Sequence, residues 1–324
     1  MFVGHEFAAF AIGVVVARRL GANDATALAI GVVAGASAIL PDLDLLVAAV
    51  AYADSLGGPA TASWDGLWSA STAIHRGLSH TLVGGVGVAV VLTAVVHARR
   101  TAGAGSKTGS LGAIGIGLVA TVGLVSVARV VGAASEMLAI GLVLLGATVL
   151  GLVVAGRTSL GVRAILGGAL VGLLTHPFGD VFMATPPAVF YPFEVTFLAD
   201  SVRFAADPTM NLVGIAFVEL VTVWAGVAAF ASVTSVSLRR AVDPLAALGL
   251  AYPLVMVFVP RPTMVDAHWL GFTLAPFGIV GTLTLLGRHH RRRDRLLRAL
   301  VTGLATVTLA AGSYSFAYLL FFRP

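Results

Sequence analysis

Four short motifs combine histidine and acidic residues near the ends of apolar stretches. They are Gly4-His5-Glu6, Pro41-Asp42-Leu43-Asp44, His75-Arg76-Gly77-Leu78-Ser79-His80 and Thr175-His176-Pro177-Phe178-Gly179-Asp180. Neutral imidazole and carboxylate are the side chains that bind Zn²⁺ when no thiolate is present, and this chain has no cysteine. Several such groups together can hold two metals, an arrangement that suits phosphodiester or ester hydrolysis. These residue types therefore predict a site for a divalent metal, with zinc as the first expectation.

The spacing within the third and fourth motifs limits which side chains can face a shared ion. His176 and Asp180 are four residues apart and share one face of a regular helix. Pro177 disfavours helical backbone at His176 and so complicates this geometry. His75 and His80 would lie about 140° apart around a helix, so we expect His75 in the preceding loop. The two motifs thus predict ligands at the end of one helix and at the start of another.

The second motif places two carboxylates inside an apolar stretch. Asp42 and Asp44 would point to nearly opposite sides of a helix, unless Pro41 unwinds the backbone enough to aim both inward. Otherwise one carboxylate is a ligand and the other holds a ligand in place. An acidic side chain in such a stretch costs roughly 2.5–3.5 kcal/mol on membrane-insertion scales, which makes it a functional candidate. Glu219 also lies within an apolar segment, and it either lines the same cavity or pairs with a neighbour.

The elements that must carry these motifs are apolar segments. Hydrophobic residues make up 58% of the 324 residues and charged residues 11%, against roughly 25% charged in soluble domains. About ten segments approach or exceed the roughly 20 residues with which a helix crosses a bilayer. They cover residues 5–17, 25–53, 78–98, 110–133, 136–155, 164–183, 210–236, 244–260, 269–287 and 299–322. The sequence therefore predicts an all-α, polytopic transmembrane helical bundle.

The basic residues predict how these segments are oriented. With the N-terminus outside, the inside connections hold the basic clusters, as the positive-inside rule requires. These clusters are Arg18-Arg19, Arg99-Arg100 with Lys107, Arg157 with Arg163, Arg239-Arg240, and the arginines of Arg288–Arg298. Both termini and all four motifs then lie toward the outer face. We therefore expect a multi-pass protein of the plasma membrane whose site faces the non-cytoplasmic side.

The net charge of +5 and the pI near 10.2 do not indicate a nucleic-acid-binding protein. The strongest basic cluster, Arg288–Arg298, is flanked by apolar segments on both sides. Clusters in such places set membrane topology and bind anionic lipid headgroups. The expected partners are therefore the lipid bilayer and a lipid or phosphoester substrate, with no nucleic acid.

The four motifs together resemble those of the YdjM type of membrane-bound, metal-dependent hydrolases, also described as LexA-binding inner-membrane hydrolases. The matching residues are Gly4-His5, Leu40-Pro41-Asp42-Leu43-Asp44, His75-Arg76-Gly77-Leu78-Ser79-His80-Thr81 and Thr175-His176-Pro177-Phe178-Gly179-Asp180, followed by Thr185-Pro186 and Tyr191-Pro192. This chain departs from the pattern in the order of the hydroxyls at Ser79 and Thr81, in Thr175, and in Pro177. The resemblance covers roughly residues 1–200 and implies a hydrolase domain there, with additional transmembrane helices in residues 201–324.

The leading hypothesis is a membrane-embedded, metal-dependent hydrolase that cleaves a phosphoester or lipid ester at the outer face through a metal-activated water. Its metal ligands would be His5, Asp42, His75, His80, His176 and Asp180. Asp44 or Glu6 would act as general base or hold a ligand in place, and Arg76 would bind a phosphate oxygen or brace a carboxylate. The alternatives are a cation transporter lined by Asp and His, and a non-catalytic membrane scaffold with a polar cluster.

Overall fold

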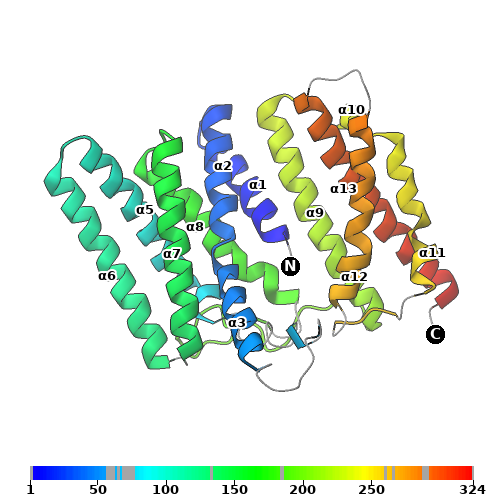
Figure 1. The fold of residues 1–324 in the computed structure, drawn as a ribbon, viewed down its shortest axis with the longest axis horizontal. Coiled ribbons are helices and arrows are strands. Elements are labelled where there is room, and N and C mark those ends of the chain that lie inside the picture. Colours follow the sequence, from blue (N-terminus) through cyan, green and yellow to red (C-terminus); the bar gives the residue numbers. More distant parts are fainter. Residues whose placement is uncertain are drawn as a thin grey trace. The chain divides into compact units, whose positions relative to one another are not determined.

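The computed structural model describes residues 3–55, 63, 66–67, 77–131, 134–182, 186–258, 261–264, 267–286 and 292–322. Every regular element among these residues is a helix, which confirms the all-α prediction. The chain, whose helices are drawn in Figure 1, divides into two compact units. Unit 2 comprises His5–Val181 and Thr185–Ser201, and unit 1 comprises Met1–Gly4, Phe182–Ala184 and Val202–Pro324. The functional boundary near residue 200 stays a prediction from the family resemblance.

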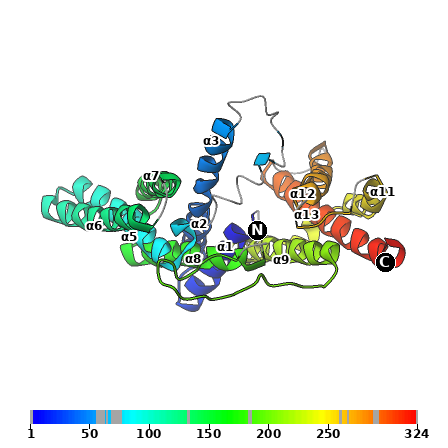
Figure 2. The ribbon, with the colours of Figure 1, turned by 90° about the horizontal axis from the view of Figure 1, so that it is seen from below.

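Unit 2 consists of long helices that pack side by side. They are α1 (Gly4–Arg19), α2 (Asp24–Ala38), α3 (Leu45–Ser55), α5 (Leu82–Gly103), α6 (Lys107–Val131), α7 (Ala134–Arg157) and α8 (Val162–Gly179), with short 3-10 turns η1 (Pro41–Asp44), η2 (Leu78–His80) and η3 (Asp180–Phe182). Helix α5 packs against α6, α7 and α8, and α2 packs against α8. Helix α3 contacts α7, and Figure 2 shows it projecting away from the row formed by α5, α6 and α8. Aliphatic side chains such as Leu92, Ile140 and Ile165 fill the core between these helices.

Unit 1 is built around its last long helix. Its elements are α9 (Pro208–Thr234), α10 (Leu238–Ala241), η4 (Pro244–Ala251), α11 (Tyr252–Met256), α12 (Ala267–Leu274), η5 (Ala275–Leu286), α13 (Arg292–Ala317) and η6 (Tyr318–Phe322). Helix α13 packs against η5, η4, α9 and α11. The ring of Tyr252 is fully buried and meets those of Phe277 and Tyr314 edge-on, with centroids 5.2 and 5.9 Å away.

The helix lengths agree with a protein that crosses the membrane many times. Seven stretches among the described residues are long and apolar enough to cross a bilayer. They are Asp24–Val47, Leu82–Gly103, Lys107–Val130, Ala134–Arg157, Val162–Phe182, Pro208–Thr234 and Arg295–Phe321. The other three expected segments form shorter helices, namely α1 with 16 residues and the apolar stretches Pro244–Met256 and Leu270–Leu285. The prediction of about ten apolar helical segments is therefore confirmed.

Local sequence sets where two of the site-bearing helices begin. Asn23 precedes α2, and its side-chain oxygen accepts a hydrogen bond of 2.9 Å from the backbone N–H of Thr26. Thr81 precedes α5, where its hydroxyl oxygen accepts from the N–H of Gly84 and donates to the carbonyl of Leu78, each at 2.9 Å. Such caps satisfy backbone groups that a helix end otherwise leaves unpaired. The cap at Thr81 also ties η2 to the first turn of α5.

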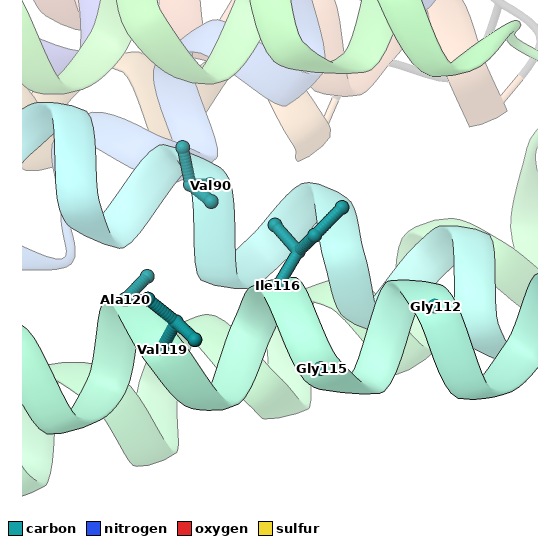
Figure 3. Close-up of a pocket in the computed structure, with 6 residues that line it drawn as sticks. All are labelled: Val90, Gly112, Gly115, Ile116, Val119 and Ala120. Carbon is teal, nitrogen blue, oxygen red and sulfur yellow. The ribbon is translucent and has the colours of Figure 1, made fainter.

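An apolar groove of about 500 Å³ lies between α5 and α6 (Figure 3). It is lined by Val90, Gly112, Gly115, Ile116, Val119 and Ala120. Because these residues carry aliphatic side chains or none, the groove offers contacts to a hydrocarbon chain and no group for acid–base or metal chemistry.

Candidate metal centre

The polar motifs of unit 2 lie at one end of its helices. His5 is in the first turn of α1, and η1 follows the end of α2. His80 closes η2 immediately before α5, and His176 and Asp180 lie at the end of α8. In Figure 1 these helix ends lie in the lower half of unit 2, above the lower ends of α3, α6 and α7. The chain order alone therefore brings four distant segments to one level.

The 3-10 turn η1 places the carboxylates of Asp42 and Asp44 at the same site. Residues Pro41–Asp44 form a 3-10 turn instead of a continuation of α2. The Oδ1 atom of Asp42 lies 3.5 Å from Nε2 of His80 and 3.4 Å from Nε2 of His176. The Oδ2 atom of Asp44 lies 3.2 Å from the other nitrogen of His80, Nδ1. Both carboxylates thus lie beside the imidazole of His80, Asp42 at Nε2 and Asp44 at Nδ1.

Ser79 completes a hydrogen-bonded group behind His80. Its hydroxyl donates to Oδ2 of Asp44 at 2.9 Å and lies 2.9 Å from Nδ1 of His80. With a carboxylate and a hydroxyl oxygen facing Nδ1, the proton of the neutral ring belongs on Nδ1, and Nε2 is presented as a ligand. Burial lowers the pKa of His80, but the carboxylates of Asp42 and Asp44 outweigh it and raise the pKa to about 9. A metal ion at Nε2 would therefore displace a proton.

Asp180 lies between two histidines. Its Oδ1 atom is 3.4 Å from Nε2 of His5, and its Oδ2 atom is 3.7 Å from Nε2 of His80. The ring of His5 stacks on that of His176, with centroids 4.1 Å apart. Two sets of groups therefore have the geometry to hold a metal, His5 with His176 and Asp180, and Asp42 with His80 and His176.

The proline in α8 does not interrupt the helix that carries His176. Helix α8 continues through Pro177 to Gly179. Proline has no N–H to donate to the carbonyl of Leu173, one turn earlier. Gly85 of α5 lies against this carbonyl, where even a Cβ atom would be only 3.2 Å from the oxygen. A close glycine, whose Cα–H can face the oxygen, accommodates the group that proline leaves without its helical partner.

A close approach between two helices and a hydrogen bond hold the ligand-bearing elements in position. At Gly172, one turn before His176, a Cβ atom would lie 2.9 Å from the backbone nitrogen of Ala38 and closer still to the carbonyl of Ala34. Only glycine lets α8 approach α2 here, just before α2 leads into η1. On the other side, the carboxylate of Glu136 in α7 accepts a hydrogen bond from the backbone N–H of Leu78 and so holds η2.

The separations between these atoms fit a metal centre better than a hydrogen-bonded cluster. Hydrogen bonds to nitrogen are normally 2.7–3.2 Å long, and the His–carboxylate distances of 3.4–3.7 Å around Nε2 exceed this range. Ligands about 2.1 Å from a tetrahedral zinc ion lie about 3.4 Å from one another. Neither nitrogen of His176 has a hydrogen-bond partner among the described residues, although its ring is fully buried. Such burial is costly unless another partner binds the ring.

The structure describes five of the six residues expected as ligands, and it brings all five together. His75 and Arg76 lie outside the described residues. Glu6 follows His5 in the first turn of α1 and is half-buried. Glu219 belongs to unit 1, where its carboxylate accepts a hydrogen bond of 2.6 Å from the backbone N–H of Val3.

Sequence reasoning assigned no role to Ser79, Glu136 or Gly172. Glu136 could have been noticed as a single acidic residue in the first turn of an otherwise apolar helix. Ser79 could have been noticed from its place directly before a candidate ligand. The importance of Gly172 has no such signal, because unit 2 contains many glycines and only packing distinguishes them.

The fold and this cluster define an all-α, multi-pass membrane protein with buried histidines and aspartates at one end of a helical unit. The chain belongs to the YdjM inner membrane protein family, whose model matches residues 1–261. The match extends beyond the roughly 200 residues that the motifs cover. No curated protein and no solved structure matches the chain. Family and spans together place it in the plasma membrane.

Proposed function

We propose that this protein is a metal-dependent hydrolase that cleaves a phosphoester or a lipid ester. The observation that carries the proposal is the buried group of three imidazoles and two carboxylates whose atoms are separated as the ligands of an ion are. Removing these groups from water costs several kcal/mol unless a cation compensates them. Zinc is the first expectation for such a set of nitrogen and oxygen donors.

The residues of the cluster have different proposed roles. His5, Asp42, His80, His176 and Asp180 would hold the metal, which when bound supplies a water of lowered pKa and polarises the ester oxygen. Asp44 and Ser79 orient His80 from behind. Asp42 has a side chain exposed to 22%, against 2% or less for the other four, so substrate would approach from its side. Glu6 is the candidate general base, and Arg76 the candidate for binding a phosphate oxygen.

The proposed location of the reaction is the outer face of the membrane. The end of unit 2 opposite the cluster carries most of its basic residues, at the α1–α2 turn, at the α5–α6 turn and around the α7–α8 connection, whereas Arg129 lies in the last turn of α6 at the cluster end. The positive-inside rule assigns the end with most of the basic residues to the cytoplasm. The cluster then faces outward, where a lipid headgroup or an exported phosphoester can reach Asp42.

Metal content is the decisive measurement. Protein purified in detergent without chelator should contain a divalent metal, and His176→Ala should lose it. The matched control is His97→Ala, because His97 lies on α5 away from the cluster and should leave the content unchanged. Wild-type protein that neither contains nor takes up zinc or manganese would contradict the proposal. Hydrolysis of phosphoester and lipid-ester probes that disappears in His176→Ala would then identify the reaction.

The two alternative functions, a cation transporter and a non-catalytic scaffold, require different properties of the cluster. A cation transporter needs ionisable groups that continue across the membrane. Among the described residues of unit 2, every buried ionisable side chain belongs to the cluster at one end. A scaffold would not need metal, and it would keep its structure in a chelator.

A further inference from the structure

The orientations of the imidazole rings distinguish one ion from two. A metal bound to an imidazole lies close to the plane of the ring, along the lone pair of the nitrogen. The rings of His80 and His176 are inclined at 69°, with centroids 4.7 Å apart. Planes inclined this steeply intersect, and Nε2 of both rings lies within 3.5 Å of the same oxygen of Asp42, so one ion can lie close to both planes.

The rings of His5 and His176 do not permit the same arrangement. They stack with an interplanar angle of 23° and centroids 4.1 Å apart. An ion close to one ring plane at a bond length of about 2.0–2.1 Å therefore lies well outside the other plane. The lone pairs of His5 and His176 are aimed at two separate points.

Asp180 has the position to connect these two points. One of its carboxylate oxygens lies 3.4 Å from Nε2 of His5, and the other lies 3.7 Å from Nε2 of His80. A carboxylate that offers each oxygen to a different histidine is suited to bridging two ions. Ions in two-metal hydrolytic sites are separated by about 3.5–4 Å, a distance comparable to that between the stacked rings.

We propose that the centre holds two divalent ions bridged by Asp180. One ion is bound by Asp42, His80 and His176, and the other by His5. This inference rests on the proposed metal binding and adds the number of ions and the division of ligands between them.

The charges of the site support two ions and indicate the class of substrate. With neutral imidazoles, Asp42, Asp44 and Asp180 give three negative charges within the cluster. One divalent ion leaves a negative charge uncompensated in a buried place, whereas two ions compensate all three aspartates. Two divalent ions with positions open to substrate attract anionic oxygens, so a phosphoester fits this site better than a neutral carboxylic ester.

The ions differ in the number of protein ligands. In the proposed division, the ion beside His5 has His5 and Asp180 as its ligands among the described residues, whereas the other ion has Asp42, His80, His176 and Asp180. The ion beside His5 should bind more weakly and keep more positions for water and substrate. Binding of metal to stripped protein should therefore occur in two steps of different affinity.

Manganese titration of the full-length protein in detergent, after removal of metal by a chelator, tests the proposal by electron paramagnetic resonance. Wild-type protein should take up about two Mn²⁺ per chain, and the second should produce the spectrum of a magnetically coupled pair. His5→Ala should bind one Mn²⁺ without coupling, and His5→Gln, which retains a polar group in the buried position, should do the same. The control His97→Ala should behave as wild type.

The outcomes separate this inference from the proposed function. A single uncoupled Mn²⁺ in wild-type protein would overturn the two-ion site and leave a mononuclear hydrolase in place. Two coupled ions that persist in both His5 variants would overturn the assignment of His5. No uptake by wild-type protein would overturn the metal-dependent function itself. The wild-type spectrum decides the number of ions even if a His5 variant does not fold.

Discussion

Asp44 lies 3.2 Å from Nδ1 of His80, whereas Asp42 lies 3.5 Å from Nε2 of the same ring. Two neighbouring carboxylates in one short turn therefore have different partners on one imidazole. Asp42 is on the side where a metal would bind, and Asp44 is on the opposite side, together with the hydroxyl of Ser79. This division leads to distinct expectations for the two residues.

Asp44→Asn should weaken metal binding without abolishing it. Loss of the carboxylate behind a metal-binding histidine typically reduces affinity 10–100-fold, because the ring loses its fixed orientation and part of its basicity. Competition with a chromogenic chelator measures the change. Asp42→Asn should lower affinity further, since it removes a proposed ligand, and Asp24→Asn at the opposite end of unit 2 should have no effect. Equal losses for Asp42→Asn and Asp44→Asn would contradict the division of roles.

Glu136 should influence the centre through the backbone of η2. Its carboxylate accepts from the N–H of Leu78, and a Cβ atom on Gly77 would collide with that carboxylate. Glu136→Ala and Gly77→Ala disturb this contact from its two sides. Each should lower metal affinity roughly tenfold, in line with the 1.5–3 kcal/mol typical of a hydrogen bond to a charged group. The exposed Glu194 offers a control, since Glu194→Ala should keep wild-type affinity.

Gly172 should be intolerant of a side chain. Gly172→Ala inserts a methyl group against the carbonyl of Ala34 and should lower the free energy of unfolding by about 1–3 kcal/mol, as overpacking does. Gly167→Ala is a matched control on the same helix, because a Cβ atom there has nothing within 4 Å. Thermal unfolding in detergent compares the two variants. A Gly172→Ala protein as stable as Gly167→Ala would show that α2 and α8 are not held this closely.

Asp243 should stabilise unit 1 in a pH-dependent manner. The backbone N–H of Leu245 donates to its carboxylate and lowers its pKa, burial opposes this, and Arg298 lowers the pKa further. A depressed pKa in the folded state stabilises the protein above the unfolded pKa of about 3.9, and this stability is lost as the pH falls through the folded pKa.

Asp243→Asn keeps an acceptor for the N–H of Leu245 but removes the charge that pairs with Arg298, so it should lower the free energy of unfolding by about 0.5 kcal/mol at pH 7. The difference from wild type should shrink toward pH 3. Thermal unfolding at both pH values measures it. A difference that is the same at both would contradict the electrostatic explanation.

The orientation in the membrane can be tested in this cysteine-free chain. Glu194→Cys, near the cluster end of unit 2, and Thr108→Cys, at the start of α6, introduce single exposed thiols at opposite ends of the helices. An impermeant maleimide applied to intact cells should label the first and not the second. Labelling of Thr108→Cys alone would reverse the topology and move the centre to the cytoplasmic face.

The sequence by itself determined the class of protein and the level of its site. Apolar segments long enough to cross the bilayer have to form helices in lipid, because a helix makes all the hydrogen bonds of its own backbone and no water is there to replace them. Successive segments cross the membrane in opposite directions. His5, His80 and His176 were therefore expected at the same end of the helices. These properties depend on composition and order along the chain, so no tertiary contact was needed to predict them.

The tertiary structure decided how the side chains at that end face one another. The rotation and separation of neighbouring helices depend on packing, as at Gly172, where the absence of one Cβ atom brings α8 against α2. A 3-10 turn places Asp42 and Asp44 at different nitrogens of His80, although on a regular helix they would point to opposite sides. The stacking of His5 on His176 likewise follows from side-chain contact between distant segments. The hydrophobic pattern along the sequence fixes depth in the membrane, but it carries no information about these angles.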